Sequence, residues 1–251
     1  MHDPPTRSRD RLPLLLALPY TLYAVTLFLA VALVALLVIL PLPSLRWRRI
    51  VVRTAAHIGL GVTGVRIAVR HAGRLPAGTC VVVANHASYL DGVVLKAALP
   101  ARFGFVIKRE MNDVPLAGLL LRRIGAEFVD RSKGQRGARD ARRVLKTASS
   151  GASLVFFPEG TFEPAPGLLR FHSGAFVTAV RNGYPVVPMV IRGTRRILPP
   201  HFFWPQPGII ELEFLEPVAS SLDGIEADAA ALRDRARSAI LAQLGEPDRA
   251  G

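Results

Sequence analysis

Cysteine, lysine and acidic side chains are all scarce in this chain. Cys80 is the only cysteine among 251 residues, which excludes an internal disulfide and any metal site built on cysteine ligands. The lysines number four, so nearly all positive charge is arginine, and 19 acidic residues face 32 basic ones. The formal net charge of +13 favours an anionic partner: nucleic acid, an anionic membrane face, or a phosphorylated or CoA-like ligand.

The chain also lacks internal repeats, low-complexity linkers and nucleic-acid recognition motifs. Its length suits one large domain, or one domain with an anchor, and we predict a membrane-anchoring segment at 1–53 and a globular domain at 54–251. Without a recognition motif, charge alone is a weak reason to expect nucleic acid, and we predict none as a partner. Cys80 opens the apolar run Val81–Val83, where a buried, unreactive thiol is expected.

One long stretch near the N-terminus carries no charge. Within it, Tyr20–Leu40 supplies about 20 apolar positions, the length needed to cross the hydrocarbon core of a bilayer. Ala30-Val31-Ala32 resembles a signal-peptide cleavage site, but the apolar run continues past it and is too long for a signal core. We therefore predict attachment to the cytoplasmic (inner) membrane, with the domain facing the cytoplasm.

Arginines flank both ends of this stretch, so two arrangements stay open. The basic cluster Arg46–Arg49 favours a single span with its C-terminal side in the cytoplasm. A re-entrant helical hairpin, broken near Pro19 or Pro41, would keep both ends on one face.

Strand and helix patterns alternate from about residue 65 to the end, which predicts an α/β fold with a mixed β-sheet flanked by helices. The expected strands are 65–70, 81–84, 103–108, 127–129, 153–157, 184–191 and 209–215. The expected helices are 90–99, 115–124, 135–149, 173–182 and 225–244, with an amphipathic connector at 53–65 and a Pro-rich loop at 194–207. Pro185 and Pro188 indicate that strand 184–191 is irregular or near an edge.

Three of the expected strands run into polar turns. These turns are Asn85–Asp91, Asp130–Arg131 and Pro158–Thr161. In open α/β sheets, ligands bind just beyond the carboxyl ends of the strands, so neighbouring strands would bring the three turns to one edge. His86, steadied there by Asp91, can take a proton from a hydroxyl. The same residues also suit a surface histidine, with Asn85 or Ser88 capping the following helix.

Four blocks of this sequence, taken together, resemble a known enzyme family. The blocks are Asn85–Asp91, Phe128–Arg131, Phe157–Thr161 and Val186–Val190. Their order and spacing, over about residues 65–200, are similar to those of the membrane glycerolipid acyltransferases, the 1-acylglycerol-3-phosphate O-acyltransferase family. The resemblance implies the α/β fold of that family for residues 54–251.

The resemblance also implies an activity: transfer of a fatty acyl group from acyl-CoA or acyl carrier protein to the hydroxyl of a lysolipid. The first acceptor expected is 1-acylglycerol-3-phosphate, which would give phosphatidate, and no cofactor or metal is expected. A thioester is already activated, so no covalent enzyme intermediate is needed. His86 would act as general base, and Asp91 would hold the imidazole in the right tautomer.

Five residues are predicted to bind substrate. They are Asn85, Arg131, Glu159, Gly160 and Thr161. The planar fork of Arg131 suits a phosphate or carboxylate. Glu159 would accept a hydrogen bond from an acceptor hydroxyl, orient an arginine, or stabilise its own turn, and Gly160 would supply backbone freedom.

The chain departs from the family pattern at two places. After Thr161 the family usually has a basic residue and then serine, but here Phe162 and Glu163 follow. Downstream, where the family often has lysine, this chain has Phe171 and His172. Each charge-assisted hydrogen bond is worth about 1.5–3 kcal/mol, so losing two of them affects the choice of acceptor. Another lysolipid, such as lyso-ornithine lipid, and a non-catalytic lipid-binding membrane protein are the alternatives.

Overall fold

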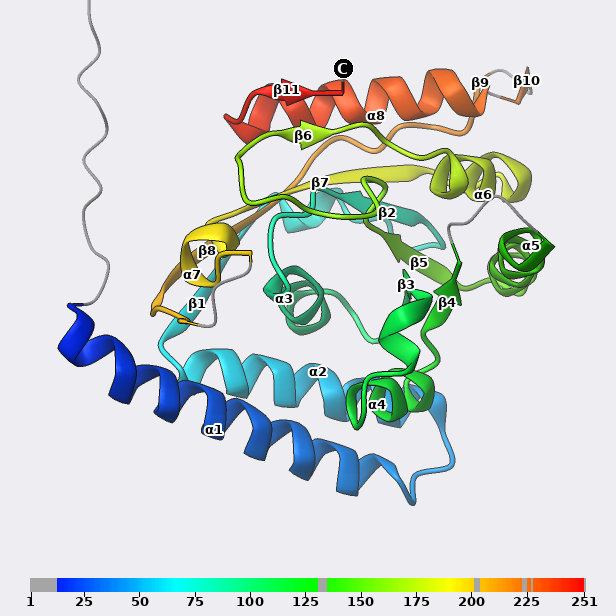
Figure 1. The fold of residues 1–251 in the computed structure, drawn as a ribbon. Coiled ribbons are helices and arrows are strands. Elements are labelled where there is room, and N and C mark those ends of the chain that lie inside the picture. Colours follow the sequence, from blue (N-terminus) through cyan, green and yellow to red (C-terminus); the bar gives the residue numbers. More distant parts are fainter. Residues whose placement is uncertain (1–12, 131–134, 201–203, 223–224, 227, 251) are drawn as a thin grey trace, which may run out of the picture.

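The structure is a computed structural model that describes residues 13–130, 135–200, 204–222, 225–226 and 228–250. A seven-stranded sheet in the order β1-β8-β7-β2-β5-β3-β4 forms its centre (Figure 1). The strands are β1 (Val65–Arg70), β2 (Val81–Ala84), β3 (Phe103–Lys108), β4 (Glu127–Val129), β5 (Ser153–Phe156), β7 (Val186–Arg192) and β8 (Gly208–Phe214). Neighbours are parallel except β7 and β8, which confirms the predicted mixed sheet.

Helices cover both faces of this sheet (Figure 1). One face carries α2 (Leu45–Val62) and α3 (Leu90–Ala98), and the other carries α5 (Gln135–Ser149), α6 (Gly174–Asn182) and α8 (Ala229–Leu244). The side chains of β2 alternate between the two layers: Val81 and Val83 pack in one apolar cluster, Val82 and Ala84 in the other. Burial on both sides explains why this strand is a continuous apolar run.

The remaining elements are short. They are the 3₁₀ turns Ala72–Arg74 and Arg109–Asn112, the helices α4 (Ala117–Arg123) and α7 (Thr194–Ile197), and the strands β6 (Leu168–Leu169), β9 (Ser221–Leu222), β10 (Ile225–Glu226) and β11 (Asp248–Arg249). β6 pairs in parallel with β11, and β9 pairs with β10.

Helix α1 (Leu14–Ile39) lies antiparallel along α2. Near its start, the hydroxyl of Tyr20 donates to the carbonyl of Thr63 at 2.6 Å. Near its end, Leu36 and Ile39 are buried in a cluster with Val52 of α2. Among the described residues, α1 is the one helix long and apolar enough, by length and composition, to cross a membrane. Its outer face exposes a row of large apolar side chains.

Strand β7 corrects the prediction of an irregular or edge strand. It lies inside the sheet, between β2 and β8. The carbonyl of Pro188 accepts the Leu215 N–H at 2.9 Å. In a strand, the N and the O of one residue point to the same side, so the nitrogen of Pro188 also faces β8. The β7–β8 ladder begins at the next residue, Met189, so the N–H that Pro188 lacks is not needed for strand pairing. Pro185 precedes the strand, so neither proline breaks the pairing.

Three helix boundaries also differ from the predictions. Residues 53–62 of the expected connector at 53–65 belong to α2, so the predicted boundary between residues 53 and 54 falls inside a helix. α4 begins at Ala117 and not at Pro115, because Leu116 adopts a φ of 59° before it. α8 begins at Ala229 because Asp228 caps it: the side chain of Asp228 accepts the main-chain N–H groups of Ala230 and Ala231.

Candidate active site

The carboxyl ends of β2 and β5 meet at one edge of the sheet. The two strands are adjacent and parallel, so the turns that follow them lie side by side. The main-chain N–H of His86, after β2, donates to Oε1 of Glu159, after β5, at 2.6 Å. Asp130 follows β4, which is parallel to β3 and so ends at the same edge. Arg131 lies outside the described residues, so its predicted substrate contact stays a prediction.

The side chains of His86 and Asp91 are in contact. The distance from His86 Nδ1 to Asp91 Oδ2 is 2.8 Å. Asp91 belongs to the first turn of α3 and is fully buried, whereas the imidazole is 17% exposed. An Nδ1–H donated to this carboxylate leaves Nε2 as the basic nitrogen. The spacing of five residues therefore produces the contact expected of a general base with its orienting acid.

Asp91 also holds the turn that carries the histidine. Its Oδ2 accepts the main-chain N–H of Ala87 at 2.6 Å and that of Ser88 at 2.8 Å. Ser88 in turn accepts the Leu90 N–H with its hydroxyl oxygen, at 3.2 Å. The N–H groups of residues 86, 87 and 88 therefore all point at carboxylates of the protein, and they hold the turn.

Glu159 is a scaffold residue in this structure. Its side chain is buried, 4% of the residue being exposed, and its second oxygen accepts the Leu169 N–H at 2.8 Å. Burial raises the pKa of this carboxyl to about 7, although both main-chain donors act in the opposite direction. The predicted contact with an acceptor hydroxyl is replaced by two main-chain contacts, so the turn-stabilising alternative describes the observed geometry.

Asn85 also pairs with the main chain. Its Nδ2 donates to the Ile191 carbonyl at 2.9 Å, and its Oδ1 accepts the Ile191 N–H at 2.7 Å. The residue is 3% exposed. The amide thus extends the pairing of β2 with β7 past the end of the ladder. Its side chain is turned into the protein, and its predicted role in substrate binding stays a prediction.

Gly160 and Thr161 complete the turn after β5. Gly160 has a φ of 78° and donates its N–H to the Phe157 carbonyl at 3.0 Å, so it supplies the backbone freedom that was predicted. Thr161 is exposed. Its predicted contact with substrate remains a prediction.

Two phenylalanines that carried no predicted role cover the imidazole. Phe157 stacks on His86 with ring centroids 4.2 Å apart and planes at 17°. Phe162 meets the same ring edge-on at 4.5 Å, and Tyr89 meets Phe162 at 4.8 Å. Phe162 stands where the family usually has a basic residue, and that departure was the one signal in the sequence for this contact. The histidine thus lies between apolar rings.

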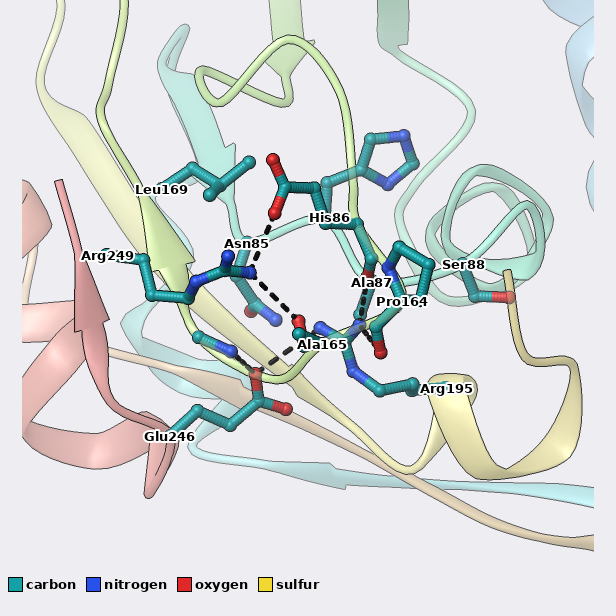
Figure 2. A network of polar contacts seen from close by, with 12 residues as sticks. Asn85, His86, Ala87, Ser88, Pro164, Ala165, Leu169, Arg195, Glu246 and Arg249 are labelled. Atoms are coloured by element: carbon teal, nitrogen blue, oxygen red, sulfur yellow. Dashed lines mark hydrogen bonds and ion pairs between the residues drawn. The ribbon is translucent and has the colours of Figure 1, made fainter. Parts of the chain in front are cut away.

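The loop that carries Phe162 is held by a clasp segment, residues 246–249 (Figure 2). The guanidinium of Arg249 pairs with Glu163 at 2.7 Å, and Glu246 accepts the Gly167 N–H at 2.6 Å. Arg195 donates to the carbonyl of Pro164 at 3.1 Å and pairs with Glu246 at 3.4 Å. The loop is therefore tied to α7 and to the segment after α8.

Metal binding has no support within the part of the chain that the structure describes. No group of three or more His, Cys, Asp or Glu side chains is arranged there to hold an ion.

The protein has a mixed β-sheet flanked by helices, and a histidine–aspartate pair lies just beyond the end of a central strand. A family model described as "Acyltransferase" matches residues 66–192, slightly more than half of the chain. The chain belongs to this acyltransferase family.

Among curated relatives, the chain is 34% identical over 120 residues to the chloroplastic 1-acyl-sn-glycerol-3-phosphate acyltransferase BAT2 of Brassica napus. The aligned stretch covers 48% of this chain and 35% of that protein. It is 34% identical over 160 residues to the human lysophospholipid acyltransferase LPCAT4, covering 62% of this chain and 29% of that protein. The chain thus spans about a third of the length of these relatives.

The fold is also similar to the crystal structure of the 1-acyl-sn-glycerophosphate acyltransferase PlsC from Thermotoga maritima. The TM-score is 0.74, over 91% of this chain and 93% of that one, at 22% identity. At this identity the likeness concerns the fold alone.

Proposed function

We propose that this protein is a membrane-associated O-acyltransferase that moves a fatty acyl group from an acyl thioester to the hydroxyl of a lysolipid. One observation carries the proposal: His86 Nδ1 lies 2.8 Å from the buried carboxylate of Asp91 at the sheet edge, in a chain of the acyltransferase family. Relatives named for 1-acyl-sn-glycerol-3-phosphate and for lysophospholipids support a monoacyl glycerophospholipid as acceptor. We take 1-acylglycerol-3-phosphate, giving phosphatidate, as the first candidate.

The mechanism needs one base. Nε2 of His86 takes the proton of the acceptor hydroxyl as its oxygen attacks the thioester carbonyl. The tetrahedral intermediate then collapses, the C–S bond breaks, and the proton passes from the imidazolium to the departing thiolate. Asp91 stabilises the imidazolium, and general-base help of this kind contributes about 10²–10⁴-fold.

The aromatic rings support the same chemistry. Phe157 and Phe162 cover the imidazole and restrict water around it, which favours attack by the acceptor hydroxyl over hydrolysis of the thioester. Because residues 86 to 88 donate their N–H groups to Glu159 and Asp91, the donors that stabilise the oxyanion come from elsewhere.

Lyso-ornithine lipid is a second candidate acceptor, and Phe162 favours it. Its hydroxyl is carried on the fatty acyl chain, and the lipid contains no phosphate. An edge-on phenylalanine against His86, where a basic residue is usual, suits such an acceptor better than it suits a phosphate.

The packing of α1 supports the hairpin arrangement over a single span. α1 runs along α2, and α2 is fixed to the domain: Arg49 donates to the carbonyls of Ile124 at 2.9 Å and Arg102 at 3.1 Å. A spanning α1 would draw the arginines of α2 into the hydrocarbon, at about 2.5–3.5 kcal/mol for each one near the centre. We propose that the hairpin rests on one leaflet of the cytoplasmic membrane, with the outer face of α1 immersed and the domain facing the cytoplasm.

An acceptor panel tests the activity. Wild-type protein is incubated with one acyl thioester and, separately, with 1-acylglycerol-3-phosphate, lysophosphatidylcholine and lyso-ornithine lipid. Mass spectrometry should find the diacylated product of at least one acceptor, together with acceptor-dependent release of thiol. Lipid binding without any new product would contradict the proposal and favour a non-catalytic lipid-binding protein.

A further inference from the structure

Helix α5 presents a basic face that the proposed mechanism does not use. Its basic side chains are all exposed, whereas its one acid, Asp140, is buried. Helical spacing gathers them on one side, opposite Val144 and Ala148, which pack in the core. The basic residues are Arg136, Arg139, Arg142, Arg143 and Lys146.

Most of these charges have no carboxylate partner among the residues that the structure describes. Within the described ranges, Arg143 is the one basic residue of α5 that forms an ion pair. On α8, by contrast, Arg233 pairs with Asp234 and Arg237 pairs with Asp248. The basic face of α5 is therefore a net positive surface and not part of a balanced network.

A polar cleft adjoins this face. It has a volume of about 270 Å³ and is lined by Arg109, Asn112, Arg122, Ala126, Phe128 and Arg143. Carboxylates hold two of its guanidiniums: Asp140 accepts from Arg109 at 2.5 Å, and Glu127 accepts from Arg143 at 2.8 Å. Arg122 instead donates to the side-chain oxygen of Asn112 at 2.8 Å, so its charge has no carboxylate partner among the described residues. Pre-oriented guanidiniums with an excess of positive charge suit a phosphate.

The basic face does not point at the membrane proposed above. α5 lies on the face of the sheet opposite α2, and α1 lies beyond α2 (Figure 1). With α1 on a leaflet, the exposed arginines of α5 belong to the helix layer on the other face of the sheet. A soluble anionic partner fits this position, and an anionic membrane does not.

The cleft lies within reach of His86 for an acyl donor that carries its thioester on a phosphopantetheine arm. Arg109 follows β3 and Phe128 lies in β4, the second and third strands from β2 in the sheet. At about 4.8 Å per strand, these positions are roughly 10–14 Å from the end of β2. A phosphopantetheine arm has about thirteen bonds from phosphorus to sulfur and, at roughly 3.5 Å per three bonds of extended chain, spans about 15 Å.

We propose that α5 and the adjoining cleft dock a small acidic carrier protein that delivers the acyl group on a phosphopantetheine arm. The arm's phosphate enters the cleft, the thioester reaches His86, and acidic side chains of the carrier face the arginines of α5. This inference rests on the proposed function, because it names the donor of the same reaction. Electrostatic complementarity of this kind acts on encounter and on KM more than on the chemical step.

The test compares three donors that carry the same acyl group: an acyl carrier protein, CoA and N-acetylcysteamine, the last of which has no phosphate. Reversing two exposed charges in Arg136→Glu/Arg139→Glu should raise KM for the carrier-protein donor at least 10-fold. KM for the other two donors, and kcat for all three, should stay within twofold. Arg66→Glu/Arg235→Glu reverses two exposed arginines on β1 and α8, and it should leave all KM values unchanged.

A second variant tests the cleft. Arg122→Gln removes the guanidinium that lacks a carboxylate partner among the described residues, so it should raise KM for the carrier-protein and CoA donors severalfold. The increase should disappear with the N-acetylcysteamine donor. If Arg136→Glu/Arg139→Glu raised KM for CoA as much as for the carrier protein, or changed neither, docking of a carrier protein on α5 would be overturned.

Direct binding separates this inference from the proposed function. A fluorescently labelled acyl carrier protein should bind the wild-type protein at low salt, and it should bind Arg136→Glu/Arg139→Glu at least 10-fold more weakly. Carrier binding without turnover of any donor would refute the proposed function and leave the docking surface standing. Turnover of acyl-CoA without carrier binding would do the reverse.

Discussion

The carboxylate of Asp91 organises the turn that presents His86. Its Oδ2 accepts three donors: the imidazole and the main-chain N–H groups of Ala87 and Ser88. Its Oδ1 is buried and has no partner among the residues described. The orientation of the base therefore depends on one charged oxygen.

Removing that charge should slow the reaction. Asp91→Asn keeps the size of the side chain, but its neutral amide stabilises neither the imidazolium nor the Nδ1–H tautomer. We expect kcat to fall by about 10²–10⁴-fold in an assay of acceptor-dependent thiol release. A kcat within a few-fold of wild type, with the fold intact by circular dichroism, would contradict the role given to Asp91.

The pKa of Glu159 predicts how stability depends on pH. Burial raises this pKa from an ordinary 4.5 to about 7 in the folded chain. Between those values the folded state keeps a proton that the unfolded state has released, so the free energy of unfolding should fall as pH rises. The fall belongs between about pH 4.5 and pH 7 and is on the order of 3 kcal/mol.

Glu159→Gln provides the comparison, because the amide does not titrate. Chemical denaturation at several pH values should show the wild type losing stability relative to this variant across that window, with a constant difference above about pH 7. A difference that does not change with pH would show that the buried carboxyl keeps an ordinary pKa.

At the residue scale, the sequence was enough to predict the contact of His86 with Asp91. It was not enough to predict the main-chain contacts of Asn85 and Glu159, whose substrate roles were implied by the family resemblance. A sequence shows that polar atoms stand at a strand end, but not which way their lone pairs point. In the structure those atoms pair with the main chain of His86, Leu169 and Ile191, which lie on other segments of the chain.

At the scale of elements, the loop after Glu159 links the clasp segment to the histidine. β11 of the clasp segment pairs with β6, β6 donates the Leu169 N–H to Glu159, and Glu159 accepts the N–H of His86. Gly167 makes this pairing possible. A Cβ there would lie 2.3 Å from Cδ of Arg249 and 3.0 Å from the Pro247 carbonyl oxygen.

Gly167→Ala should therefore loosen the clasp segment. We expect a lower melting temperature and a kcat reduced severalfold, because the support of the histidine turn weakens. Gly151→Ala is the matched control: Gly151 also has a positive φ, of 87°, but a Cβ there meets nothing within 4 Å. Equal losses in both variants would mean that backbone strain, and not the contact with the clasp segment, sets the effect.

Elements with a strong local pattern were predicted with their observed bounds. β1 alternates, β3 is an apolar run, and α5 has one apolar and one basic face. The start of α8 and the central place of β7 were missed. The first depended on the Asp228 cap, and the second on which side of the strand the missing Pro188 donor faces, which only the sheet order decides.

At the scale of the whole molecule, the exposed apolar face of α1 and the basic face of α5 belong to different layers. The exposed apolar residues of α1 form one side, and the basic face of α5 lies across the sheet from it. This separation predicts a protein that meets lipid with one layer and a soluble partner with the other.

The hairpin arrangement predicts that both ends of α1 lie on the same side of the membrane. Pro13→Cys and Pro43→Cys place thiols at exposed positions just before α1 and just before α2. An impermeant thiol reagent should label both from the cytoplasmic side of inverted vesicles and neither from the outside of cells. Cys80 is buried, with a pKa raised to about 11 by burial, so its background labelling should be low. Labelling of the two positions from opposite sides would show a single span.

The most direct test of the account is acyl transfer by His86→Ala, measured as acceptor-dependent thiol release with the acceptor that wild type prefers. We predict a loss of at least 10²-fold in kcat with the fold retained, whereas His57→Ala, at an exposed histidine of α2, should match wild type. A His86→Ala protein that transfers the acyl group at close to the wild-type rate would contradict the account.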